Sequence, residues 1–202
     1  MGTRHLIAVS TGNDYPIAQY GQWDGYPDGQ GIDVLDFCVN LNDETFRKGF
    51  ELGMLHTKDV KELTEGEFKT IEETIEADPN WTVNYPQLSR DAGAKILNYV
   101  YEARNSTTPI PVKRYLEFAA DSLFCEWAYV IDMKHRRLEV YKGFNKNPLD
   151  KNERFYGIVD KENISGAEYQ PVRFLVAYDF DKLPSKKDFV KEVNKLAGYE
   201  ED

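Results

Sequence analysis

The sequence predicts an α+β fold in which helices pack on a mainly antiparallel sheet. Turn residues and hydrophobic periodicity give the element order ββ-ααα(α)-ββββ-α, with strands in consecutive pairs instead of alternating singly with helices. The 202 residues are 41% hydrophobic and 13% aromatic, which suits a folded core and excludes a disordered chain. We therefore expect a single α+β domain over residues 1–202.

The chain is expected to begin with a β-hairpin followed by a helix. Residues 4–9 and 16–23 read as strands, and the Thr11-Gly12-Asn13-Asp14 cluster between them contains a Gly and an Asn that tolerate positive φ. The Gly-rich stretch 25–31 then predicts a turn, and apolar residues recur at helical spacing over 32–38.

Three helical segments should follow. Asp43 is a suitable N-cap for a helix over 43–54, and Thr64-Glu65-Gly66-Glu67 forms a capping box that opens a helix ending by Asp78-Pro79. An apolar stripe predicts another helix over 88–102, and Gly93 would lie inside it. Glycine costs roughly 1 kcal/mol relative to alanine in a helix interior, which suggests the close approach of another backbone.

The second half of the chain predicts four strands and a last helix. Residues 123–131 are apolar on both faces, as in a strand covered on both sides, and 138–141 form the returning strand. Further strands are expected at 154–158 and 172–180, and Pro184-Ser185 opens the final helix.

The net charge of −10 disfavours nucleic acid or an anionic membrane as partner. The segment 58–78 contributes about half of this charge, and an acidic tail at 198–202 contributes most of the rest, so the remainder of the chain is nearly neutral. An anionic small molecule is therefore not excluded. No leader sequence or long apolar run is visible, and Cys38 and Cys125 lie in apolar stretches, so we expect a cytoplasmic protein with free thiols.

Motifs for phosphate loops, dinucleotide binding, zinc proteases, EF-hands and serine hydrolases are missing from the sequence. The three histidines are scattered along the chain, and none of them lies close to a cysteine in the sequence. We therefore expect no metal and no cofactor. The basic cluster 134–137 coincides with a predicted turn and is more typical of a solvated tip than of a nucleic-acid contact. The irregular stretch 145–170 carries no recognisable motif.

The segment 20–31 is the first candidate site, because aromatic rings, a carboxylate and amides adjoin a glycine-rich turn. Its candidate ligand-binding residues are Gln22, Trp23, Asp24 and Tyr26. The alternative is that Trp23 and Tyr26 only close the end of the sheet.

Glu126 is a second candidate, since it interrupts the most apolar predicted strand. A buried carboxylate needs a cation or hydrogen-bond donors, and Arg4 and Arg90 are the expected partners. Such a pair is either architectural or part of a ligand-binding cleft. Asp91 suits a first helical turn, whereas Arg90 there opposes the helix dipole and suggests another role.

The chain resembles a family of uncharacterised proteins from fungi, bacteria and phages. The matching segments are 1–7, 18–27, 88–91, 122–132 and 142–146, with the QWDGYP and SLFCEWAYVID stretches among them. The resemblance covers most of the chain and implies no known activity. Because shorter phage proteins share the Thr3-Arg4 start and the Trp23–Tyr26 core, it points to a role in phage–host conflict.

The layout also resembles that of N-terminal-nucleophile hydrolases, in which a strand begins with an exposed Cys, Ser or Thr. This chain has Gly2 at that position, so an amide hydrolase would have to use Thr3 or Cys125 as nucleophile, with Glu126 or His5 as base. Our leading hypothesis is instead non-covalent binding of a small polar or anionic ligand or of a protein partner. A purely structural role, with the acidic helix at 65–77 as contact surface, is the third possibility.

Overall fold

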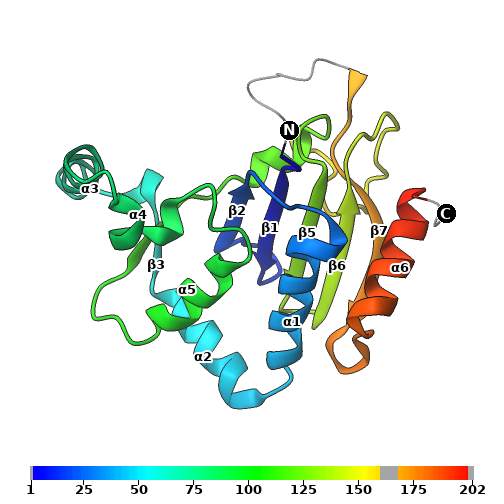
Figure 1. Cartoon of the computed structure of the whole chain (residues 1–202), viewed down its shortest axis with the longest axis horizontal. Coiled ribbons are helices and arrows are strands. Elements are labelled where there is room, and N and C mark those ends of the chain that lie inside the picture. The colour runs from blue at the N-terminus through cyan, green and yellow to red at the C-terminus, as the bar shows by residue number, and fades with distance from the viewer. Residues whose placement is uncertain (1, 160–167, 200–202) are drawn as a thin grey trace.

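The structure is a computed structural model that describes residues 2–159 and 168–199. Its main sheet has the strand order β2-β1-β5-β6-β7, and the only parallel pair within it is β1 with β5. The strands are β1 (His5–Ser10), β2 (Ile17–Gly21), β5 (Trp127–Asp132), β6 (Arg137–Lys142) and β7 (Arg173–Asp179). The predicted α+β class and the mainly antiparallel sheet are confirmed (Figure 1).

The helices lie between and after these strands. They are α1 (Ile32–Asn40), α2 (Glu44–Leu55), α3 (Glu65–Ala77), α4 (Trp81–Asn84), α5 (Lys95–Ala103) and α6 (Lys186–Ala197). A second, parallel pair joins the short strands β3 (Thr57–Asp59) and β4 (Ile110–Val112), which the sequence did not predict. In Figure 1, α1 and α6 lie over one face of the sheet, and α3 projects away from it at the far end. No helix among the described residues has the length and apolar character needed to cross a membrane.

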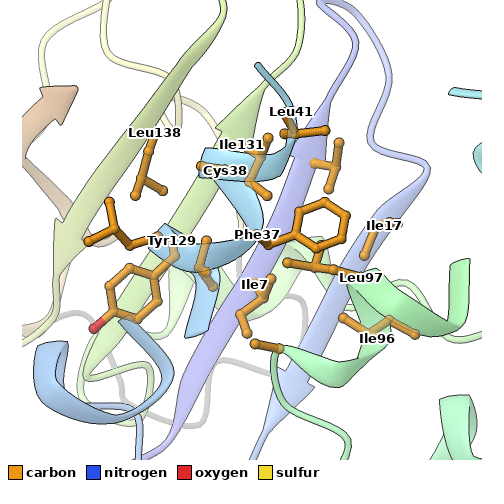
Figure 2. Packing of buried hydrophobic residues seen from close by; sticks show 14 of the residues in the cluster. Ile7, Ile17, Phe37, Cys38, Leu41, Ile96, Leu97, Tyr129, Ile131 and Leu138 are labelled. Carbon is orange, nitrogen blue, oxygen red and sulfur yellow. The ribbon is translucent and has the colours of Figure 1, made fainter. Parts of the chain in front are cut away.

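Both faces of the main sheet are covered at β1 and β5, which explains the continuous apolar runs of these two strands. Ile7 and Val9 face the helices and belong to one core cluster with residues of α1, α2, α5 and α6. Figure 2 shows Ile7 in this cluster together with Phe37 of α1 and Leu97 of α5. Leu6 and Ala8 point to the opposite face, where Phe155 is completely buried. Successive side chains of β1 therefore belong to two different cores, as the two-residue period of a strand requires.

The local signals for the helix starts are confirmed. Thr64 and Glu67 form the reciprocal capping box of α3, Asp43 accepts from the backbone N–H of Phe46 at the start of α2, and Ser185 caps α6. Hydrogen bonds from the Thr64 backbone and from Lys58 lower the pKa of Glu67 to about 2.

Three predicted elements are corrected by the structure. Residues 154–158 are turns instead of a strand, because Arg154 and Phe155 both point toward the protein interior and break strand alternation. The helix expected from residue 88 begins only at Lys95, after a 3₁₀ turn over Pro86–Leu88 and an irregular loop. The strand expected from residue 123 begins at Trp127.

Parts of the irregular segment 145–170 and of the acidic tail 198–202 lie outside the described residues. In the described part of the first segment, residues 145–159 contain turns and bends, and the strand expected there at 154–158 is not formed.

Candidate functional site

A pocket of about 280 Å³ opens where the loop after β2 meets the loop before α5. Its lining residues are His5, Trp23, Asp24, Gln30, Asp33, Arg90, Asp91, Ala92, Gly93 and Lys95. We call it the His5 pocket, because His5, at the first position of β1, contributes its most deeply buried polar side chain.

Two glycines make room for the His5 imidazole. Gly21 is its partner across the β1–β2 pair, and a Cβ atom at Gly21 would lie 2.2 Å from ring atoms of His5. A Cβ atom at Gly25 would lie 2.8 Å from the Cβ of His5 and 2.8 Å from the Thr3 carbonyl oxygen. Glycine is therefore required at both positions, because a side chain at Gly21 would meet the His5 ring and one at Gly25 would meet the His5 Cβ atom and the Thr3 carbonyl oxygen.

His5 is held in its neutral form. Burial lowers its pKa to about 4, against a weaker opposite effect of the Thr3 backbone carbonyl. Within residues 2–159 and 168–199, neither ring nitrogen has a hydrogen-bond partner of normal geometry, although His5 is only 1% exposed. A neutral imidazole offers one N–H donor and one acceptor nitrogen, and among the described residues neither is engaged in a hydrogen bond of normal geometry.

We expect Gly21→Ala to destabilise the protein by about 1–3 kcal/mol, because the added methyl group overpacks the His5 ring. Urea denaturation of the single variant, of His5→Ala and of the double variant measures the coupling. In the double variant the methyl group meets no imidazole, so most of the cost of Gly21→Ala should disappear. A cost that is unchanged in the His5→Ala background would mean that backbone strain causes the loss.

Five charged side chains surround the pocket without pairing. Asp24, Asp33 and Asp91 are acidic, and Arg90 and Lys95 are basic. In the part of the chain that the structure describes, no ion pair within 4 Å involves any of these five. The pocket therefore presents both signs of charge to a molecule that enters it, next to the neutral His5.

Backbone hydrogen bonds join the two loops that form the pocket. Gln22 N–H donates to the Arg90 carbonyl at 3.2 Å, and the Gln30 side-chain oxygen accepts from Ala94 N–H at 2.6 Å. Gly93 has φ +50°, and a Cβ there would lie 2.3 Å from the Gln30 side-chain oxygen. The sequence predicted the close approach of another backbone to a helical Gly93. The structure places Gly93 in the loop before α5 instead, and the group that approaches it is the side chain of Gln30.

Asp24 has a positive φ of 58°, which is uncommon for a residue other than glycine. Its carbonyl accepts from Gln30 N–H at 2.9 Å, while the next residue, Gly25, donates to the Thr3 carbonyl at 3.0 Å. These two bonds hold the turn against β1 and keep Asp24 at the pocket.

The structure brings together four of the residues that the sequence singled out, namely Trp23, Asp24, Arg90 and Asp91. Three others from the same segments or their neighbourhood do not line the pocket: Arg4, Gln22 and Tyr26. The Gln22 side-chain oxygen instead accepts from the Tyr20 hydroxyl at 2.5 Å, and Tyr26 is 48% exposed.

Glu126 lies just before β5 and is half-buried, and the expected ion pair is not found in the described chain. Its carboxylate accepts from the backbone N–H of Arg4 at 3.3 Å, and the Arg4 guanidinium instead covers the Phe124 ring at 4.3 Å. The cation near Glu126 is Lys142, whose pKa is lowered by burial and partly restored by that carboxylate.

Both residues considered as nucleophiles are buried. Thr3 is 4% exposed, and its carbonyl is bonded to Gly25. Cys125 is fully buried on the face of the sheet opposite the helices, and burial raises the pKa of its thiol well above the ordinary value. His5 lies on the other face of β1, because Leu6 and Ala8, which pack with Cys125, alternate with it.

The sequence interpretation did not name Gln30, Asp33 or Lys95 as ligand-binding residues, although Gln30 lies within the candidate segment 20–31. It considered His5 only as a base for Thr3 or Cys125. One signal was available for His5. Gly21 lies opposite His5 in the β1–β2 hairpin, and Gly25 follows four residues later. Two glycines at these positions indicate that the imidazole packs directly against the backbone.

A larger cavity of about 640 Å³ lies beside β6 and contains Arg137, Glu139, Tyr141 and Arg154. Its charged groups bind one another: Arg154 donates to Glu139 at 2.6 Å and also pairs with Asp132, and Tyr141 donates to Glu139 at 2.6 Å. Because these bonds leave its buried polar groups satisfied, the His5 pocket is the better candidate for ligand binding.

The described residues contain no group of three or more His, Cys, Asp or Glu side chains placed to hold a metal ion. Comparison of the chain with protein-family models, with curated proteins and with solved structures finds no match.

Proposed function

We propose that the protein binds a small polar ligand with an anionic group in the His5 pocket, without a covalent step. The observation that carries this proposal is the His5 imidazole, which is buried at the pocket with neither nitrogen in a normal hydrogen bond to the described residues. Burying polar atoms without partners costs roughly 1–3 kcal/mol per group, and a bound ligand would recover that free energy.

The surrounding charges define the ligand further. Arg90 and Lys95, which form no ion pair with the described residues, can bind a carboxylate or phosphate, and Asp24 and Asp91 can accept hydrogen bonds from amino or hydroxyl groups. The half-exposed Trp23 ring adds an apolar wall. A volume of about 280 Å³ is at the small end for ligand pockets, so the ligand has the size of an amino acid or a small sugar phosphate.

The proposal predicts that Trp23→Ala combined with Asp24→Ala abolishes binding with little loss of folding. The probes are glutamate, glycine, acetate and inorganic phosphate, and the readout is the ¹⁵N chemical shift of the His5 ring nitrogens during titration. Tyr26→Ala is the matched control, because Tyr26 is an exposed aromatic residue of the same turn outside the pocket lining. Unchanged binding in the double variant, or no response of His5 to any probe, would contradict the proposal.

A further inference from the structure

A second cavity of about 430 Å³ lies along the outer edge of β2, and it is distinct in character from the His5 pocket. Four aromatic side chains line it: Tyr20, Trp81, Tyr115 and Phe118. They come from β2, from α4 and from the segment before β5, so only the folded chain brings them together. We call this cavity the aromatic pocket.

The aromatic rings stand edge-on to one another instead of filling the space by stacking. The Tyr20 ring meets Phe118 at 4.9 Å with an interplanar angle of 77°, and it meets Tyr115 at 6.0 Å and 64°. Trp81 is half-buried at the same cavity. A flat ligand in this cavity would lie beside aromatic rings, and stacking on aromatic side chains is favourable for any planar π system.

Gln19 supplies a polar group without a partner in this pocket. The residue is 1% exposed, and its side-chain N–H₂ donates to the backbone carbonyls of Tyr20 at 2.9 Å and Ser89 at 3.1 Å. These two acceptors fix the orientation of the amide, since a reversed amide would place oxygen against oxygen. The Gln19 Oε1 atom is then left as a buried acceptor that no group in the described chain satisfies, and it requires a donor.

Two cations complete the pocket. Lys113 and Arg90 both line it, and neither takes part in an ion pair within 4 Å in the described ranges. Arg90 also lines the His5 pocket, so it stands on the wall between the two cavities. The aromatic pocket therefore combines ring faces, one buried acceptor and a basic wall.

From this combination we infer a second ligand site that takes a planar heteroaromatic ring with an N–H donor and an anionic substituent, as in a nucleoside monophosphate. The base would lie among the aromatic rings and donate an N–H or amino hydrogen to Gln19 Oε1. The phosphate would contact Lys113 and Arg90. This inference does not depend on the function proposed for the His5 pocket.

Titration of the full chain with AMP, adenosine and ribose 5-phosphate tests the inference by isothermal calorimetry and by the Trp81 indole N–H signal in NMR. AMP should bind most tightly, because only AMP carries both the base and the phosphate. Trp81→Ala should weaken AMP binding about 5- to 150-fold, the range expected for loss of one stacked base. Lys113→Ala should weaken AMP and ribose 5-phosphate but leave adenosine unchanged.

Trp23→Ala is the matched control, because it removes a tryptophan from the other pocket. Thermal unfolding of each variant establishes that it is folded before binding is compared. Absence of AMP binding to the unmodified chain at millimolar concentration would overturn the inference. It would also be overturned if AMP binding were weakened by Trp23→Ala but not by Trp81→Ala, a result that would place the nucleotide in the His5 pocket.

Discussion

Arg154→Met should lower the free energy of unfolding by about 3–5 kcal/mol, because it removes the cation shared by two buried carboxylates. Asp132 and Glu139 are each 1% exposed. Burial raises the pKa of Asp132, but hydrogen bonds from His135 and Arg154 outweigh it and leave the pKa lowered. The pKa of Glu139 is lowered in the same way by Arg154 and Tyr141. Without Arg154, both charges would remain buried with fewer partners.

Arg137→Met is the matched control. Arg137 also pairs with Glu139, but its side chain is 39% exposed, so its removal should cost less than about 1 kcal/mol. Adding Asp132→Asn and Glu139→Gln to Arg154→Met should recover part of the loss, since the buried charges are then gone. Urea denaturation at pH 7 measures all of these variants. If Arg154→Met and Arg137→Met lowered the free energy of unfolding equally, the buried ion pairs of Arg154 would contribute no more to stability than the partly exposed pair of Arg137.

The second large effect is a loss of stability in mild acid that depends on His5. The pKa of His5 falls from 6.5 to about 4 on folding, so the unfolded chain binds a proton more readily than the folded one. The stabilisation is complete above pH 6.5 and decreases as the pH falls toward 4. A shift of this size corresponds to about 3 kcal/mol.

Denaturation of the natural chain and of His5→Gln between pH 7 and 4.5 measures this effect. The natural chain should lose stability over that range, and the variant should lose less, because glutamine does not titrate. The carboxylates of Asp132 and Glu139 contribute below this range, since their lowered pKa values give stability that is present above about pH 4.5 and lost as the pH falls further. Parallel pH profiles for the two chains would show that His5 is not the titrating group.

The fold follows from the sequence wherever a short segment contains its own signal. The Thr64–Glu67 capping box marks the start of α3, and the turn cluster 11–14 joins β1 and β2, because both signals act through neighbours in the chain. The strand predicted for residues 154–158 from the same kind of local pattern is wrong. There the side chain of Arg154 reaches the carboxylates of β5 and β6, and that distant pairing overrides strand propensity.

The candidate site was partly visible in the same way. Trp23 and Asp24 stand in one conspicuous segment, and Arg90 and Asp91 stand in another, but nothing local says that these segments meet. Their meeting depends on bonds such as Gln22 N–H to the Arg90 carbonyl, across 68 positions of the chain. For Glu126, the local sequence pattern was misleading. It lies in an apolar stretch but just before β5, and its carboxylate accepts from the backbone N–H of Arg4 instead of pairing with an arginine side chain.

By itself, then, the sequence determined the α+β class, the β1–β2 and β5–β6 hairpins and the starts of α2, α3 and α6, since patterning, turn residues and capping act over a few residues. The tertiary structure alone decided that His5 would be buried with neither ring nitrogen in a normal hydrogen bond to the described residues, because its environment is built from Gly21, Gly25 and the loop before α5. It also decided that Gln19 would be a buried acceptor. Burial and unsatisfied hydrogen bonds are properties of how distant segments pack, and no single segment specifies them.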